Sequence, residues 1–548
     1  MFYMYMNLND RKNFINALLI LAMGGVAFLW TASILPDRLF PENVSSSSIV
    51  MDSLMLVAME EKITDVQPVN ETSKAIKEVD SLSKSEASTP VSVSNKNNLP
   101  PITDSQLIRI ADFDFNLSRP LDSSGLRSVP LPRKRYGYKG TTYLNTFFQK
   151  LKTLETDSSQ TVRIAYYGDS MVDGDLIVQD LRSALQGRFG GRGVGFVPIK
   201  SESARSRYSV KHKSGGNWDQ RTFMKSITDS LDYGISGAVF HAMDSTANVS
   251  FKASGIKHSY RLNSPKLFYG KGNDSSQVSF MTEKDSVFNK LDLDQRKPLN
   301  ITQISRKDLK ELNLDCGNAT GVPIYGVDFF NEQGITVDGF SHRGNSGLPL
   351  SLLDEELIKE FNKELHYDLI VLQFGANVLS TKTKRFNWYA NRMKRVVTHL
   401  NMIFPDTPIL IMGTADKGTK IGETVKTDST VVRLLRSQQQ FASESQSGFL
   451  SLFHLMGGIH SMPAWRDHKL ANADFTHLSP KGSRKMGRLI FNALMEDYNE
   501  YLRKLPKESS NKEQLLATEN SSLKDANSLK QEKDTLIQMD STKTDSNE

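Results

Sequence analysis

Apolar residues follow two different periods along the chain, and each period predicts one type of element. Continuous apolar runs are typical of strands buried on both faces of a parallel sheet. Such runs occur at 161–167, 368–374, 408–413 and 448–453. Apolar residues at helical spacing lie between them, at roughly 351–364, 386–403 and 430–446. This alternation predicts an α/β domain whose parallel sheet is covered by helices on both faces.

Two further helices have clear boundaries in the sequence. After the first apolar run, one apolar stripe at helical spacing consists of Ile177, Leu181, Leu185 and Phe189. The glycines at 190–191 are expected to end this helix. Near the other end of the domain, Ser479 can cap a helix and Pro480 suits its first turn.

The middle of the chain has a different pattern. Over 205–320, short runs such as GAVFHAM and QVSFMT alternate apolar and polar residues, and Gly, Asn, Asp and Ser separate them. This pattern indicates antiparallel strands. We therefore expect a β-rich, sandwich-like module inserted after the first strand and helix of the α/β domain, which itself would comprise 106–204 and 321–505.

The two ends of the chain differ from this body. Residues 14–35 form an apolar run without a charge that is long enough to cross a bilayer as a helix. Arg11 and Lys12 precede it, which predicts a cytoplasmic segment at 1–13 and export of the rest. An uncleaved signal anchor is favoured over a cleaved signal peptide. We expect a single-pass membrane protein whose body is exported across the membrane.

Polar, low-complexity stretches flank the body. Residues 36–105 contain SSSS and SLSKSEAS and few aromatic residues, which predicts a flexible linker. Residues 506–548 are rich in Lys, Glu, Ser, Asn and Asp, which predicts a disordered tail.

Charge and cysteine content exclude some functions. The net charge of +6 is small for 548 residues, and no zinc-finger or RNA-binding signature accompanies it, so we expect no nucleic-acid partner. The single cysteine, Cys316, excludes an intrachain disulfide and a Cys-rich metal site. His454, His460 and His468 lack the spacing of metal ligands and are interpreted as polar loop residues. We expect neither a metal nor a cofactor.

Polar residues follow several strands at their carboxyl ends, where parallel sheets bind ligands. Ser170 follows the first strand, and Asn377 follows the strand at 368–374. Asp474 and His477 lie just before the last helix. A serine needs a base to take its proton, and a carboxylate can orient the imidazole that does so. Donors such as the Ser170 N–H and the Asn377 amide can stabilise an oxyanion.

Each of these short motifs also has a structural interpretation. Gly-Asp-Ser can be a turn that ends a strand, and Asp474 with His477 can be a capped helix entry. Asp173 and Asp175 are expected to cap the helix that follows Ser170 and to place first-turn charges that complement its dipole. The joint occurrence of the motifs, in order and each at the end of a strand, favours catalysis.

The motifs resemble the four sequence blocks of the SGNH (GDSL-like) hydrolases. Ser170 in YYGDSMVDGD matches the nucleophile, Gly344 in SHRGNSG the oxyanion glycine, and Asn377 in QFGANVL the oxyanion asparagine. Asp474 and His477 in ADFTHLSP match the rest of the triad. The resemblance implies a flavodoxin-like three-layer α/β/α fold, an esterase or acyltransferase activity, and an oxyanion hole formed by Ser170, Gly344 and Asn377.

The stretch from Gly168, GDSMVDGDLIVQDLRSALQGRFGGRGVGFVP, is similar to the start of bacterial peptidoglycan O-acetylesterases and O-acetyltransferases. Some of those enzymes carry a β-sandwich module at the position of the insert. The resemblance implies a serine esterase that removes O-acyl groups, best O-acetyl, from a cell-envelope glycan. Two alternatives stay open: an O-acetyltransferase with the same triad, supplied by a membrane acyl-transfer partner, and a non-catalytic glycan-binding protein.

Overall fold

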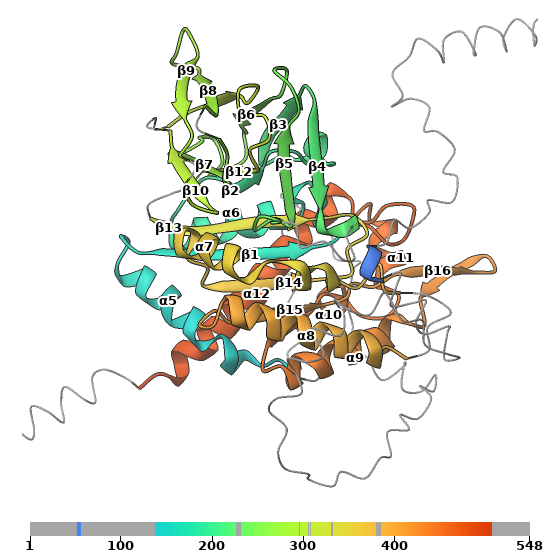
Figure 1. Ribbon diagram of the computed structural model, residues 1–548. Coiled ribbons are helices and arrows are strands. Elements are labelled where there is room, and N and C mark those ends of the chain that lie inside the picture. Colours follow the sequence, from blue (N-terminus) through green and yellow to red (C-terminus); the bar gives the residue numbers. More distant parts are fainter. Residues whose placement is uncertain are drawn as a thin grey trace, which may run out of the picture. The chain divides into compact units, whose positions relative to one another are not determined.

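The computed structural model of the chain describes residues 52–55, 138–225, 232–273, 275–294, 296–304, 306, 308–329, 333–379 and 385–506 (Figure 1). Within these ranges, no helix is both long and apolar enough to cross a membrane. The predicted anchor at 14–35 lies outside the described residues, as do the cytoplasmic segment at 1–13, most of the linker, residues 106–137 and all of the tail beyond residue 506.

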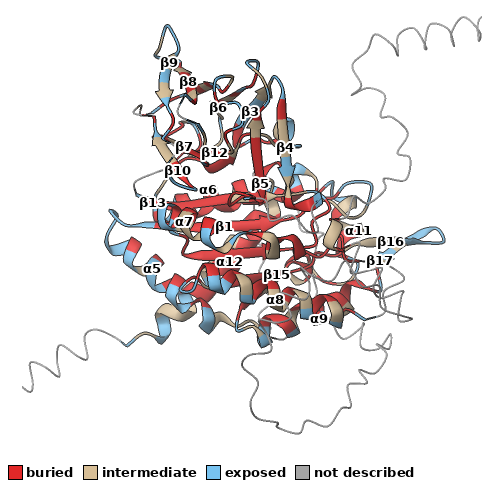
Figure 2. Ribbon diagram, in the orientation of Figure 1, coloured by how far each residue is buried: buried red, intermediate tan, exposed pale blue. Residues whose placement is uncertain are grey.

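The central sheet is parallel and has five strands. In spatial order these are β13 (Gly334–Ser341), β1 (Thr161–Gly168), β14 (Leu369–Gln373), β15 (Ile409–Gly413) and β18 (Gly448–Ser451). Numbered along the chain, the order is 2-1-3-4-5, which is that of flavodoxin-like folds. Every residue of β14 and β15 is buried, and Figure 2 shows the sheet enclosed between helices. The four apolar runs and the parallel sheet predicted from them are confirmed.

Helices cover both faces of the sheet because its strands send alternate side chains to two cores. From β1, Ala165 and Tyr167 enter one core, and Val162, Ile164 and Tyr166 enter the other. The first core is closed by α7 (Glu355–Leu365), α8 (Asn387–Ile403) and α9 (Val431–Glu444). The second is closed by α5 (Asn145–Thr156), α6 (Val178–Phe189), α10 (Leu452–Met456), α11 (Ser461–Asp467) and α12 (Pro480–Lys504).

Two antiparallel sheets form a sandwich between α6 and β13 in the chain (Figure 1). One contains β10 (Asn300–Gln303), β7 (Pro265–Tyr269), β12 (Ile324–Phe329), β5 (Ala238–Ala242) and β4 (Trp218–Thr222), with β2 (Gly195–Pro198) paired to β12. The other contains β3 (Val210–Gly215), β6 (Asn248–Ala253), β11 (Glu311–Asp315), β8 (Gln277–Thr282) and β9 (Asn289–Asp292). The sheets share one apolar core, in which the rings of Phe251 and Phe329 lie 5.3 Å apart.

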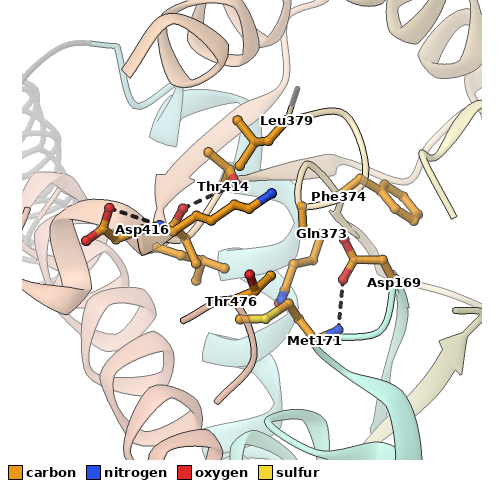
Figure 3. Close-up of a pocket in the computed structure, with 12 residues that line it drawn as sticks. Asp169, Met171, Gln373, Phe374, Leu379, Thr414, Asp416 and Thr476 are labelled. Atoms are coloured by element: carbon orange, nitrogen blue, oxygen red, sulfur yellow. Dashed lines mark hydrogen bonds between the residues drawn. The ribbon is translucent and has the colours of Figure 1, made fainter. Parts of the chain in front are cut away.

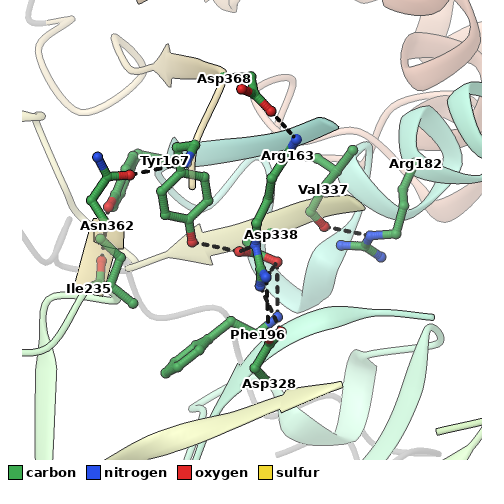
Figure 4. Close-up of polar contacts among 11 residues, drawn as sticks. Arg163, Tyr167, Arg182, Phe196, Ile235, Asp328, Val337, Asp338, Asn362 and Asp368 are labelled. Atoms are coloured by element: carbon green, nitrogen blue, oxygen red, sulfur yellow. Dashed lines mark hydrogen bonds and ion pairs between the residues drawn. The ribbon is translucent and has the colours of Figure 1, made fainter. Parts of the chain in front are cut away.

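A buried ionic network joins the sandwich to the parallel sheet (Figure 4). Arg163 in β1 donates through Nε to Asp338 in β13 at 2.8 Å and through Nη2 to Asp328 in β12 at 2.7 Å. Asp338 also accepts the backbone N–H of Phe196 in β2 at 2.9 Å. Removing the Arg163 charge would leave two carboxylates, Asp328 and Asp338, unpaired in a low dielectric, so both sides of this junction depend on the arginine.

Residues 52–55 lie inside the stretch predicted to be a flexible linker, but they are placed in the fold. They form a short helical turn, drawn in blue in Figure 1, in which Asp52 and Met55 are buried. Met55 joins the first core, and partly buried Leu54 packs against it. The linker prediction rested on the polar composition of 36–105 as a whole, which obscured the short apolar run IVMDSLMLVAM at 49–59.

Candidate active site

Ser170 lies in a tight turn at the carboxyl end of β1. A side chain at Gly168 would place its Cβ 2.3 Å from Cγ2 of Val172, so a glycine allows the turn to close. In the sheet, Gly168 pairs with Ser341 of β13 on one side and Gln373 of β14 on the other. The loops after β13 and β14 therefore begin on either side of Ser170. These loops carry Gly344 and Asn377.

Ser170, His477 and Asp474 form a hydrogen-bonded chain. The Ser170 Oγ lies 2.7 Å from Nε2 of His477, and Nδ1 of His477 lies 2.7 Å from Oδ2 of Asp474. The imidazole is thus placed to take the serine proton while the carboxylate holds its other nitrogen.

Local contacts shape the loop that carries the histidine. Asp474 Oδ1 accepts the backbone N–H groups of Thr476 and His477, each at 3.0 Å. Two residues further on, Ser479 caps α12 by accepting the N–H of Gly482 at 3.2 Å, as predicted. Asp474 and His477 are therefore positioned by a segment of a few residues.

The pKa values of the pair fit a base and its orienting carboxylate. The hydrogen bond to Asp474 raises the pKa of His477 above its usual value, against the opposing effect of burial. Burial alone would raise the pKa of Asp474. Hydrogen bonds from the His477 side chain and from the two loop N–H groups outweigh burial and lower the pKa to about 2. Both side chains are partly exposed, at 35% for His477 and 48% for Asp474, so solvent screens this pair.

The loop after β13 is buried and held by contacts distant in sequence. Gly344 has φ of +80°, a conformation that favours glycine. The Asn377 side chain is buried and donates through Nδ2 to the carbonyl of Asn345 at 3.0 Å. Tyr389 Oη of α8 donates to the carbonyl of Ser346 at 2.7 Å. The segment 344–347, here called the oxyanion loop, is thus fixed from several sides.

A small pocket lies beside the triad (Figure 3). Its walls include the sequence neighbours of the site residues: Asp169 and Met171 flank Ser170, Ala376 precedes Asn377, and Thr476 precedes His477. The remaining wall is mixed: Phe374, Leu379, Ala415 and Leu452 are apolar, and Gln373, Thr414, Asp416 and Lys417 are polar or charged. The pocket is thus formed by the sequence neighbours of Ser170 and His477, and not by these two residues themselves.

Asp169 has a structural role that the sequence did not reveal. The side chain is buried, and it accepts the N–H of Met171 at 2.9 Å and that of Ala376, so it links the serine turn to the loop of Asn377. Burial raises the pKa of Asp169 to about 6. Asp169 belongs to the Gly-Asp-Ser motif, but only the structure shows that it hydrogen-bonds to both the serine turn and the loop of Asn377.

The expectation that Asp173 and Asp175 cap the next helix is wrong. Helix α6 starts at Val178, and its N-cap residue, Ile177, provides no side-chain hydrogen bond. Asp175 instead forms a buried ion pair with Arg182, at 2.7 and 2.9 Å. Asp173 accepts from Ser203 and Arg343. Asp175 thus pairs with a buried arginine of α6 itself, and Asp173 with the exposed Arg343 of the loop after β13, so neither carboxylate caps the helix.

Other candidate residues have structural partners. His454 lies 2.8 Å from Ser451 Oγ, and His460 accepts from the backbone N–H of Thr427 at 3.3 Å. Among the described residues, no group of His, Cys, Asp and Glu could hold a metal ion. Cys316 is buried in the sandwich core, and its burial raises the pKa of the thiol.

Comparison with known proteins identifies the fold. No family model matches the chain, and no curated protein does. A solved structure of a peptidoglycan O-acetylesterase is similar, with a TM-score of 0.54 and 22% identity over 65% of this chain and 96% of that one.

Other similar structures have much lower scores. A family two carbohydrate esterase from Cellvibrio japonicus gives a TM-score of 0.23 at 10% identity, over 54% of this chain and 99% of that one. A lipase/acylhydrolase from Enterococcus faecalis gives 0.21 at 17% identity, over 32% and 80%. The fold assignment rests on the first of the three. The chain shares its fold with this peptidoglycan O-acetylesterase structure.

Proposed function

We propose that the chain is a serine esterase of the SGNH type that removes O-acetyl groups from a cell-envelope polysaccharide such as peptidoglycan. The observation that carries this proposal is the continuous chain of hydrogen bonds from Ser170 through His477 to Asp474, at 2.7 Å for each link. An isolated turn or a helix cap does not need such a chain, but nucleophilic catalysis does.

The chemistry follows from these positions. The Ser170 Oγ attacks the ester carbonyl carbon while His477 Nε2 takes the hydroxyl proton. The N–H groups of Ser170 and Gly344 and the amide of Asn377 stabilise the resulting oxyanion. The intermediate collapses, the sugar oxygen leaves with the proton from His477, and Ser170 keeps the acetyl group. Water then loses a proton to His477, attacks the acyl-enzyme, and releases acetate and free Ser170.

Two features support a short acyl group and a glycan substrate. The pocket lined by the neighbours of Ser170 and His477 is small, which supports an acetyl group over a long acyl chain. The similar solved structure is that of an enzyme named for removing O-acetyl groups from peptidoglycan, and it matches this chain over 96% of its own length. The sandwich accounts for part of that extent and is proposed to help present the polymer to the site.

We also propose that residues 14–35 anchor the protein in a bacterial inner membrane, with the body in the periplasm. The support is the uncharged apolar run and the basic residues before it. The test is alkaline extraction of membranes from cells that make the full chain. Retention in the pellet, with protease sensitivity of the body in spheroplasts, is expected. Full extraction into the soluble fraction would overturn the anchor.

The activity is tested with the full chain in detergent, as wild type, Ser170→Ala and Ser159→Ala. Ser159 lies in an exposed turn before β1, at the opposite end of that strand from Ser170, and serves as the control. We expect the wild type and the control to release acetate from p-nitrophenyl acetate and O-acetylated peptidoglycan, and Ser170→Ala to release none. Acetate release that survives Ser170→Ala would overturn the proposal. Release of p-nitrophenol that requires a sugar acceptor, with the acetyl group recovered on that sugar and not as acetate, would indicate the transferase instead.

A further inference from the structure

The oxyanion loop is held by a segment almost three hundred positions earlier in the chain. Asp52 donates its backbone N–H to the carbonyl of Gly344 at 3.2 Å. Its carboxylate Oδ2 accepts the backbone N–H of Ser346 at 2.6 Å, and the Ser346 hydroxyl bonds to the same carboxylate. One residue thus contacts both sides of Asn345.

Contacts within residues 52–55 position the Asp52 carboxylate. Oδ1 of Asp52 accepts the N–H of Met55 at 2.7 Å, which closes the short turn at 52–55. Asp52 is fully buried, and Met55 is 1% exposed within the first core. Burying a carboxylate is costly unless donors surround it, and here the donors come from its own turn and from the oxyanion loop.

These contacts determine the direction of the loop's peptide groups. Asp52 engages the carbonyl of Gly344 and the N–H of Ser346, Asn377 engages the carbonyl of Asn345, and Tyr389 engages the carbonyl of Ser346. Fixing the peptide groups after Gly344 restricts the rotation that would turn its N–H away from the serine. Oxyanion donors are effective only when they are oriented before the reaction.

We propose that Asp52 is a positioning residue that keeps the oxyanion loop, and with it the Gly344 N–H, oriented toward the substrate of Ser170. This inference rests on the proposed function. Residues 52–55, which lie within the predicted linker, thereby help to support the active site. The segment acts through the loop and does not touch the reacting atoms.

The test measures kcat and KM of the full chain on p-nitrophenyl acetate for wild type, Asp52→Ala, Asp52→Asn and Asp368→Ala. Asp368 is the matched control: it is also buried and accepts a backbone N–H, that of Arg163 at 2.8 Å, but it precedes β14 at the other end of the sheet. Loss of an oxyanion donor costs about 10²- to 10³-fold. Because Asp52 acts indirectly, we expect a kcat about tenfold lower for Asp52→Ala.

The pattern of effects distinguishes positioning from general stability. KM should stay unchanged in Asp52→Ala. The kcat of Asp52→Asn should lie between those of wild type and Asp52→Ala, because asparagine keeps one acceptor oxygen. Asp368→Ala should keep the wild-type kcat. A kcat of Asp52→Ala within twofold of wild type, or equal losses in Asp52→Ala and Asp368→Ala, would overturn the inference. If Asp52→Ala does not fold, a wild-type kcat for Asp52→Asn would overturn it.

A second readout separates this inference from the proposed function. The rate of Ser170 labelling by a fluorophosphonate also depends on the oxyanion hole, and it should fall with kcat in Asp52→Ala. A wild-type protein that is neither labelled at Ser170 nor active on the ester would refute the proposed function. A labelled, active wild type with an equally reactive Asp52→Ala would refute only the role of Asp52.

Discussion

The two halves of the candidate site are built in opposite ways. The acid–base half, Asp474 and His477, lies in one short loop, is partly exposed and is held by hydrogen bonds within that loop. The oxyanion loop is buried, and its partners come from the loop after β14, from α8 and from the segment at 52–55. The first half can form wherever its loop forms, whereas the second requires the assembled fold.

This difference has a consequence for how each half responds to change. Substitutions in the exposed loop alter the chemistry of a few side chains and leave the core intact. Substitutions around the oxyanion loop disturb buried partners, so their effects on activity and on stability should be linked. The following variants test this contrast, in order of decreasing effect.

His477→Ala should have the largest effect on the acid–base half. Without a base the Ser170 hydroxyl keeps its proton, and kcat should fall about 10⁴- to 10⁶-fold. The midpoint of thermal unfolding should remain close to that of wild type, because the side chain is only partly buried. His468→Ala, an exposed histidine at the end of α11, is the control and should keep wild-type rates. A wild-type rate for His477→Ala would remove this residue from the mechanism.

Asp474→Asn should reduce kcat less, by about 10³-fold, and should also shift the pH profile. His477 acts as a base only when neutral, so activity should be lost as pH falls through its pKa. Asp474 raises that pKa through their hydrogen bond. Without the carboxylate, burial of the imidazole lowers the pKa of His477. The acid limb of the kcat/KM profile should therefore move to lower pH. An acid limb that stays in place would show that another group controls it.

Asn377→Ala should lower kcat by about 10²- to 10³-fold, because an oxyanion donor is lost. In contrast to His477→Ala, it should also destabilise the fold, since the carbonyl of Asn345 loses its buried partner. Kinetics and thermal unfolding of the same preparations measure both effects. Asn362→Ala, at the end of α7 near the start of β14, is the control for kcat. Equal kcat values for the two variants would contradict the role of Asn377.

Tyr389→Phe should have the smallest effect on rate. The substitution removes the hydroxyl that donates to the carbonyl of Ser346 and leaves the ring packed in the core. An unpaired buried carbonyl costs about 1–3 kcal/mol of stability. We expect kcat to fall by only about threefold, because Asp52 and Asn377 still hold the loop. A loss of rate larger than that of Asn377→Ala would mean that α8, and not the loop after β14, dominates the support of the oxyanion loop.

The same contrast explains what the sequence could predict. Ser170 follows a strand within a few residues, and Asp474 and His477 precede a capped helix. Their spacing from these elements was enough to place them at the carboxyl edge of the sheet. The parallel strands were predictable because burial on both faces produces continuous apolar runs.

Contacts between distant segments could not be predicted in this way. Nothing in the apolar run around Asp52 indicates a partner at Ser346, and nothing near Asp173 indicates that Arg343 would pair with it. These pairings depend on the final packing. The support of the site therefore becomes visible only in the structure.

The most direct test of the central claim is to trap the acyl-enzyme. Wild-type protein is mixed with O-acetylated peptidoglycan, quenched with acid at early times and digested, and the peptide that contains Ser170 is analysed by mass spectrometry. The proposed mechanism predicts an acetyl group on Ser170 that appears before acetate and is absent in Ser170→Ala. Acetate released at the wild-type rate with no acetylated Ser170 at any time, or by the Ser170→Ala protein, would contradict it.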